Sequence, residues 1–251
     1  MKILLTGYTG ELGSELVEQL SKAGVRFSTL GRQEIYGSEA HFFWSLGMDP
    51  DPLVFQDIDI LIHLAWITTS RSDDANHLNI GGSSKLITSA NLSGVKVLNV
   101  SSLAAKNPKS NYGLAKLKVE GINDLGINVR LPKLIKSDSN QDSSFIERLL
   151  RKAIIVPVSS KINVAALDLR EGVNFLVELA ESDLDSGLES SRSPQFDLKE
   201  YVKFSFGFST IEISLSTLDF FIRMVSKIPI GNFSLLEDRW ISLKSINSFE
   251  A

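Results

Sequence analysis

The hydrophobic pattern at the start of the chain predicts a strand, a tight turn and a helix. Ile3-Leu4-Leu5 is a short apolar run that fits a buried strand, and glycines follow it at positions 7, 10 and 13. Apolar residues then recur at helical spacing from Leu12 to Leu20, until Gly24 ends the helix. With the next strand at 26–30, the chain opens as a β-α-β unit.

Apolar runs and helical patterns continue to alternate along the chain. The runs predict strands near 41–45 and at 58–66, 95–100 and 127–131, and the helical patterns cover roughly 79–92 and 112–125. A strand, a turn and a helix are expected within 164–181. The run at 58–66 is almost continuously apolar, as in a central parallel strand covered on both faces. The alternation predicts an α/β fold, a Rossmann-type doubly wound parallel sheet.

The pattern loosens beyond position 133. Helices are expected near 145–152 and 214–228, with a polar stretch at 136–144 and a Ser-rich stretch at 182–194. We expect these pieces to form a small, discontinuous C-terminal lobe over the carboxyl edge of the sheet, where ligands bind in such folds. The predicted domains are a dinucleotide-binding Rossmann domain of residues 1–133 and 162–182, and a substrate lobe of residues 134–161 and 183–251.

Composition narrows the set of partners. The 251 residues are 43% hydrophobic with a formal net charge of -4, so no basic field is available for nucleic acid or anionic lipid, and neither is an expected partner. The absence of cysteine excludes disulfides and thiolate chemistry and suits the cytoplasm, where we expect the protein to work. The three histidines lack metal-ligand spacing, so no metal is expected. No segment has the length of a membrane span, and the apolar start is too short for a signal peptide.

The glycine turn carries the first candidate chemistry. In Thr6-Gly7-Tyr8-Thr9-Gly10-Glu11-Leu12-Gly13, Gly7 permits the sharp turn, Gly10 lets the backbone approach a pyrophosphate, and Gly13 allows close packing of helix on sheet. The helix N-terminus favours the negative charge of the phosphates. A glycine triplet alone also fits an ordinary strand-helix turn, but its place between the first strand and first helix favours dinucleotide binding.

A second group of polar residues follows a central strand. Ser102 ends that strand, and Tyr112 and Lys116 begin the next helix at a spacing that puts both on one helical face. An ammonium there can lower the pKa of the phenol and make it a usable acid or base, and a serine hydroxyl can polarise the reacting oxygen. Alone, such a Tyr and Lys pair is usually a solvated helix face. Its place after the glycine turn and the right strand favours catalysis.

These residues together resemble the extended short-chain dehydrogenase/reductases, of the NAD-dependent epimerase/dehydratase type that acts on nucleotide-sugars. The resemblance runs in order over about residues 1–180, through the glycine turn, 59–65, 79–83, 100–102, the Tyr112 and Lys116 pair, 130–132 and Asp168 before its helix. It implies that Ser102, Tyr112 and Lys116 are catalytic, with Tyr112 the proton donor or acceptor, and that Lys116 also holds the nicotinamide ribose. His63 is expected to be a core histidine and not a base.

The resemblance also implies which residues bind the cofactor. They come from the glycine turn and from the ends of the strands: Gly7, Tyr8, Thr9, Gly10, Glu11, Leu12, Gly13, Arg32, Leu64, Ala65, Trp66, Asn79, Tyr112, Lys116, Leu131 and Pro132. Leu64 and Ala65 would contact the cofactor through their backbone, and Asn79 would lie behind the site. The Tyr-Gly that often follows the catalytic serine is missing, which predicts a short substrate loop. The C-terminal part matches poorly and leaves the substrate-binding residues unassigned.

The end of the second strand bears on the choice of cofactor. An acidic residue there holds the ribose of NAD, whereas Arg32 can pair with the 2′-phosphate of NADP or stack on adenine. The sequence therefore favours NADP over NAD, with Glu34 left as a residue that can serve NAD.

The residues after Ser102 bear on the reaction. Dehydratases of the family need carboxylates there, but Leu103 and Ala104 occupy those positions, so dehydration is disfavoured. We rank reduction of a 4-keto nucleotide-sugar first, a sugar epimerase second and reduction of a non-sugar carbonyl third. The alternative of another class is a regulatory protein that binds NADP without catalysis, which retention of Tyr112 and Lys116 disfavours. A small-molecule substrate is the expected partner, and a homodimer is left open.

Overall fold

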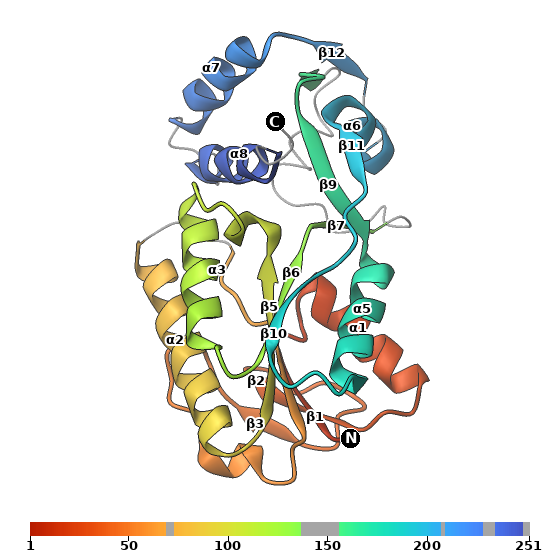
Figure 1. The fold of residues 1–251 in the computed structure, drawn as a ribbon, viewed down its shortest axis with the longest axis vertical. Helices are drawn as coiled ribbons and strands as arrows, with labels where there is room; N and C mark the ends of the chain where they lie inside the picture. The colour runs from red at the N-terminus through yellow and green to blue at the C-terminus, as the bar shows by residue number, and fades with distance from the viewer. Residues whose placement is uncertain (69–72, 137–155, 207–208, 228–233, 248–251) are drawn as a thin grey trace.

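The computed structural model describes residues 1–68, 73–136, 156–206, 209–227 and 234–247. A seven-stranded parallel sheet forms its larger part (Figure 1). In spatial order the strands are β10 (Gly187–Ser190), β6 (Ile127–Leu131), β5 (Lys96–Ser102), β4 (Ile60–His63), β1 (Ile3–Thr6), β2 (Phe27–Gly31) and β3 (His41–Phe43). The order reverses direction between β1 and β4, where doubly wound sheets bind their ligands. The Rossmann-type fold predicted from the sequence is confirmed.

Two pairs of helices cover the sheet, one pair on each face. Helices α1 (Glu11–Lys22) and α5 (Leu169–Glu181) lie on one face. Helices α2 (Asp73–Leu92) and α3 (Asn111–Ile122) lie on the other. Short 3-10 turns, η1 (Pro52–Phe55) and η2 (Leu103–Ala105), follow β3 and β5.

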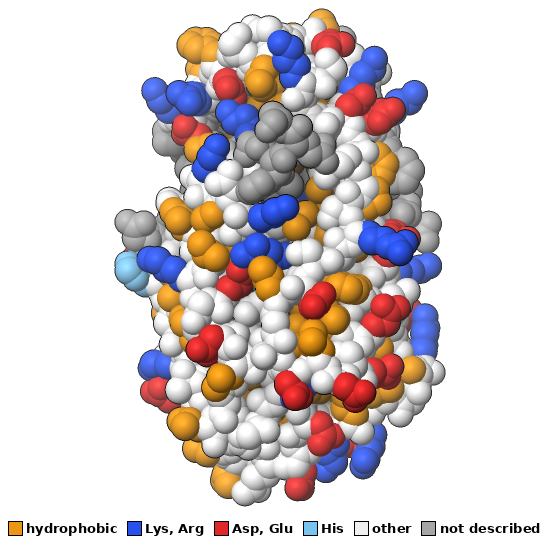
Figure 2. Space-filling model, viewed as in Figure 1, with side chains coloured by type: hydrophobic (Ala, Val, Ile, Leu, Met, Phe, Trp, Pro, Cys, Tyr) orange, Lys and Arg blue, Asp and Glu red, His pale blue; other side chains and the backbone are white. Residues whose placement is uncertain are grey.

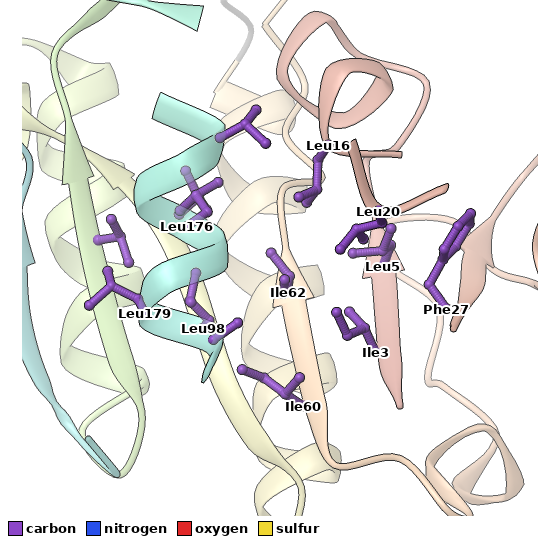
Figure 3. Packing of buried hydrophobic residues seen from close by; sticks show 14 of the residues in the cluster. Ile3, Leu5, Leu16, Leu20, Phe27, Ile60, Ile62, Leu98, Leu176 and Leu179 are labelled. Atoms are coloured by element: carbon purple, nitrogen blue, oxygen red, sulfur yellow. The ribbon is translucent and has the colours of Figure 1, made fainter. Parts of the chain in front are cut away.

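The core is apolar because the central strands are buried on both faces. On the α1 and α5 face, Leu16 and Leu176 pack on Ile62, together with Leu5 and Leu98 from neighbouring strands (Figure 3). A second cluster on the α2 and α3 face is formed by residues that include Leu4, Leu61, Leu86, Ile87 and Val119. Burial of these side chains is the main favourable term that holds the strand ends in register.

A smaller lobe lies beyond the carboxyl ends of the strands (Figure 1). It contains a three-stranded sheet of β11 (Gln195–Asp197), β9 (Asn163–Asp168) and β7 (Lys133–Ile135), and a pair of strands, β12 (Thr210–Glu212) and β8 (Val156–Val158). Its helices are α6 (Leu198–Phe206), α7 (Leu215–Ser226) and α8 (Ser234–Asn247). An apolar cluster of its own, which includes Val158, Val164, Tyr201, Leu218 and Trp240, holds these elements together.

Several elements differ from the sequence predictions. The strand expected at 58–66 is only Ile60–His63, because the chain then turns so that its amides reach the side chain of Thr6. Within the Ser-rich stretch, which the sequence predicts to be part of the lobe, β10 instead pairs with β6 as the edge of the large sheet. Helices α6 and α8 were not predicted, and the helix expected at 145–152 lies outside the described residues. The division into two domains stays a prediction.

Candidate active site

The glycine turn joins β1 to α1 in the geometry that a pyrophosphate needs. Gly7 has a φ of +69°, and a Cβ there would lie 2.5 Å from the amide nitrogen of Ala65. A Cβ on Gly13 would lie 2.3 Å from the carbonyl oxygen of Gly7, so the helix can approach the turn only without a side chain. At Gly10, by contrast, a Cβ would meet only the Gly7 oxygen, at 3.3 Å.

Gly10 is also the N-cap of α1, and no side chain caps the helix there. The first amides of α1 are therefore available to an anion, on the exposed side formed by Thr9, Gly10 and Glu11. Leu12 is half-buried against the core. The turn thus fits the phosphates of a dinucleotide.

Tyr8 closes the gap between the turn and the end of β2. Its ring is buried, its hydroxyl donates to the Gln33 carbonyl, and a Cβ on Gly31 would collide with the phenol. The ring also lies edge-on to His41, with 6.5 Å between centroids. The Tyr8 ring therefore fills the space between β2 and the glycine turn. Arg32 follows β2 and is exposed.

The loop after β4 is fixed by buried polar side chains. The amides of Leu64 and Ala65 donate to Oγ1 of Thr6, at 3.2 and 3.3 Å. The Thr6 hydroxyl therefore donates to Nδ1 of His63, 2.8 Å away, and Nε2 of His63 then carries the proton that Oγ of Ser83 accepts at 2.9 Å. Burial lowers the pKa of His63 to about 3, which leaves the ring neutral. These contacts fit the expected core histidine.

Asn79 fixes the next part of the same loop. It is fully buried, its Oδ1 accepts from the Ile67 amide at 2.7 Å, and its Nδ2 donates to the Ile67 carbonyl at 3.1 Å. The side chain therefore holds the loop that carries Trp66 and does not itself reach outward.

Ser102 and Tyr112 are brought together by a glycine. A Cβ on Gly113 would lie 2.5 Å from the carbonyl oxygen of Ala104, so η2 packs directly on the first turn of α3. Oγ of Ser110 caps that turn by accepting from the Gly113 amide at 3.0 Å. In this arrangement the side chains of Ser102 and Tyr112 are hydrogen-bonded.

Lys116 lies one turn further along α3 and is almost fully buried. Its ammonium donates to the Val100 carbonyl at 2.8 Å and lies 3.8 Å from the centre of the Trp66 ring, a cation-π distance. The Trp66 ring is edge-on to Tyr112, with 6.1 Å between centroids. Trp66 therefore contacts Tyr112 and Lys116, two of the three side chains that the sequence assigns to catalysis.

Burial dominates the titration of this group. It raises the pKa of the Tyr112 phenol, against the hydrogen bond from Ser102, and it lowers the pKa of Lys116 to about 7, against the charge of Glu120. The expectation that the ammonium lowers the pKa of the phenol is not met. The ammonium instead lies on the Val100 carbonyl and the indole, and desolvation outweighs the remaining effects.

The glycine turn and the Tyr112 and Lys116 pair lie in one matched segment. Residues 3–124 match the model of the NAD dependent epimerase/dehydratase family. The family resemblance inferred from the sequence is confirmed. The matched part runs from β1 to the end of α3, and the lobe lies outside it.

Known proteins similar to this chain differ in their reactions. A ceramide reductase from Caulobacter vibrioides (strain NA1000 / CB15N) is 26% identical over a 193-residue alignment, which covers 70% of this chain and 59% of that protein. The chain thus spans less than two thirds of that relative. The structure of MoeE5 in complex with UDP-glucuronic acid and NAD has a TM-score of 0.71 at 19% identity, and covers 85% of this chain and 86% of its own. The UDP-N-acetylglucosamine 4-epimerase from Bacillus cereus has a TM-score of 0.69 at 18% identity, and covers 97% of this chain and 96% of its own. These structural likenesses show the fold.

Two features of the described residues concern other partners. None of the described helices has the length and apolar character to cross a membrane, and no described cluster of acidic and histidine side chains is arranged to hold a metal ion. On the face shown in Figure 2, basic and acidic side chains are interspersed.

A buried ion pair that the sequence pattern did not predict lies next to Lys116 on α3. Glu120 accepts from Nε and Nη2 of Arg130, at 2.9 and 2.6 Å, and from Oγ of Ser101 at 2.5 Å. Glu120 follows Lys116 at the spacing by which Lys116 follows Tyr112, and this repeat was the available signal.

The C-terminal helix was missed as well. Helix α8 packs on η2 and α3, and Oδ1 of Asp238 accepts from the Asn111 amide at 2.9 Å, at the start of α3 (Figure 1). Leu131 and Pro132 are buried at the end of β6, where Leu131 is the register partner of Ser102. The lobe therefore touches the segment that bears Tyr112.

Proposed function

We propose that this protein is an NAD(P)-dependent ketoreductase in which Tyr112 donates the proton to the carbonyl oxygen of the substrate. The observation that carries the proposal is the arrangement of Ser102, Tyr112 and Lys116. The half-buried side chains of Ser102 and Tyr112 are hydrogen-bonded to each other, and the buried Lys116 lies one turn further along α3, at the carboxyl edge of the sheet.

The protonation state of Tyr112 is compatible with the role of proton donor. Burial raises the pKa of the phenol, so Tyr112 carries its proton at neutral pH. Ser102, whose hydroxyl already contacts the phenol, would hold the carbonyl oxygen with a second hydrogen bond. Lys116 would stabilise the phenolate that remains and hold the nicotinamide ribose.

The residues around the glycine turn would hold the dinucleotide. Gly10 and the first amides of α1 would bind the pyrophosphate, the backbone of Leu64 and Ala65 would line the cofactor, and Arg32 would pair with a 2′-phosphate. A nicotinamide dinucleotide supplies the hydride when bound. Arg32 supports NADP as the cofactor. NAD is the alternative, because the similar MoeE5 structure contains NAD.

A 4-keto nucleotide-sugar is the first proposed substrate, since the similar structures include nucleotide-sugar enzymes. Similarity to a ceramide reductase supports a second, the reduction of a carbonyl that is not part of a sugar. Both share the same proton donor. Epimerisation, the reaction named for the Bacillus cereus protein, needs oxidation and reduction at one carbon and ranks below a one-way reduction.

The test is oxidation of NADPH or NADH with a panel of 4-keto nucleotide-sugars and a ketone analogue of ceramide. With the active substrate, Tyr112→Phe should lower turnover by roughly two to four orders of magnitude while cofactor affinity changes little, because the ring is kept and only the hydroxyl is lost. Ser102→Ala should lower turnover less, since the proton donor remains.

Two outcomes count against the proposal. A folded Tyr112→Phe variant with near-parental turnover would refute the proton donor. Tight dinucleotide binding with no absorbance loss on any panel member would favour the alternative of a regulatory dinucleotide-binding protein.

A further inference from the structure

The proposed reaction leaves one buried carboxylate next to the catalytic residues without a role. The Glu120 side chain is 7% exposed, and its oxygens accept from Arg130 and Ser101. A buried carboxylate is costly unless such partners compensate it. One hydrogen bond from Ser101 and two from Arg130 join α3 to both β5 and β6. Glu120, Ser101 and Arg130 therefore form a clamp that cross-links the helix to the sheet.

The clamp lies directly beside the reacting groups. Ser101 and Arg130 are register partners, and the next pair along the two strands is Ser102 and Leu131. The residue before Ser101 is Val100, whose carbonyl accepts from the Lys116 ammonium. A shift of the Glu120 side chain would therefore displace both the Val100 carbonyl, which accepts from Lys116, and the Ser102 hydroxyl.

The charges around Lys116 give Glu120 a second effect. On α3 the ammonium has Tyr112 on one side and Glu120 on the other, with His63 facing it from β4 and Arg130 beyond Glu120 on β6. The phenol and the imidazole are neutral at pH 7, because burial raises the pKa of the first and lowers the pKa of the second to about 3. Glu120 is the group that favours the charged form of Lys116 against desolvation.

We propose that Glu120, clamped by Arg130 and Ser101, is a positioning residue that keeps the Lys116 ammonium charged and seated on the Val100 carbonyl. This inference rests on the proposed function for its consequence, since a charged Lys116 is what the dinucleotide ribose and the phenolate require. In this proposal Glu120 acts through Lys116 and not by contact with substrate or cofactor.

The direct test is the titration of Lys116 in the whole protein without cofactor, followed by NMR of 13Cε-labelled lysine. The signal is assigned by its loss in Lys116→Arg. Glu120→Gln keeps the size of the side chain and removes its charge, so the midpoint of Lys116 should move about one unit to lower pH. Glu178→Gln, the same change at an exposed site on α5, is the matched control and should leave the midpoint unchanged.

A second variant keeps the test decisive if Glu120→Gln does not fold. Glu120→Asp retains the charge but withdraws it by one methylene, so its midpoint should lie between those of the parent and the glutamine variant. Parental midpoints in a folded Glu120→Gln or Glu120→Asp overturn the proposal, and so does an equal shift in Glu178→Gln.

Turnover separates this inference from the proposed function. In an active ketoreductase, Glu120→Gln should move the alkaline limb of kcat/KM by the same amount as the NMR midpoint, and Glu120→Asp should restore part of it. A purely structural role would lower kcat at all pH values without moving the limb, which overturns the inference. A moved NMR midpoint together with parental turnover in Lys116→Met would instead overturn the proposed function and leave the effect of Glu120 on Lys116 intact.

Discussion

The Lys116 ammonium donates to the Val100 carbonyl at 2.8 Å, at a site where burial lowers the pKa of the lysine to about 7. The lysine therefore loses its charge near neutrality, well below the range of an exposed lysine. If this ammonium holds the nicotinamide ribose, cofactor affinity should weaken as pH rises through about 7. Fluorescence titration of NAD(P)H from pH 6 to 9 measures this.

Lys116→Met supplies the control for that titration. Its affinity should be lower at pH 6 and should not change across the range, because the group that titrates is gone. A parental protein whose affinity is the same at pH 6 and pH 9 would show that Lys116 does not hold the cofactor by its charge.

Two glycines of the turn should respond differently to the same substitution. Gly10→Val should fold, because a Cβ there meets only the Gly7 oxygen, at 3.3 Å. It should lose dinucleotide binding by at least about tenfold, because the side chain would project into the space proposed for the pyrophosphate. Gly13→Val should instead lower the melting temperature sharply, since a Cβ there lies 2.3 Å from a backbone oxygen. Binding and thermal melts of both variants check the pair. Parental binding by a folded Gly10→Val would contradict the phosphate site.

Those features of the site that depend on short sequence spacings could be predicted from the sequence. The glycine turn and the Tyr112 and Lys116 pair depend on short spacings and lie where the sequence placed them, as does the strand Ile127–Leu131. The contacts of Trp66 and Glu120 depend on residues far apart in sequence, and pattern alone does not show such contacts. Strand β10 escaped prediction because it is a short edge strand with exposed polar residues, which lacks the apolar run of its central neighbours.

Arg32 should select between the two dinucleotides. It is exposed at the end of β2, so Arg32→Ala should leave folding intact, weaken NADPH by about tenfold and change NADH little, because NADPH alone carries the 2′-phosphate. Dissociation constants of both cofactors are measured for parent and variant. Glu34→Gln is the complementary change and should weaken NADH alone if Glu34 holds the ribose. Equal losses of both cofactors in Arg32→Ala would remove the argument for NADP.

His63 should make the fold sensitive to mild acid. Its ring is buried and neutral between Thr6 and Ser83, and burial lowers its pKa from 6.5 to about 3. Below pH 6.5 the imidazole is protonated in the unfolded chain but stays neutral in the folded protein. The free energy of unfolding should therefore fall as the pH falls, by at most about 1.4 kcal/mol per pH unit. Urea unfolding of the parent and of His63→Gln from pH 7 to pH 4 isolates this contribution.

The parent should be more stable than His63→Gln at pH 7, because its buried hydrogen bonds are intact, and this difference in stability should shrink steadily as pH falls. His77→Gln, at an exposed position on α2, should follow the parent throughout. A constant difference between the parent and His63→Gln from pH 7 to pH 4 would show that the imidazole is free to protonate in the folded state.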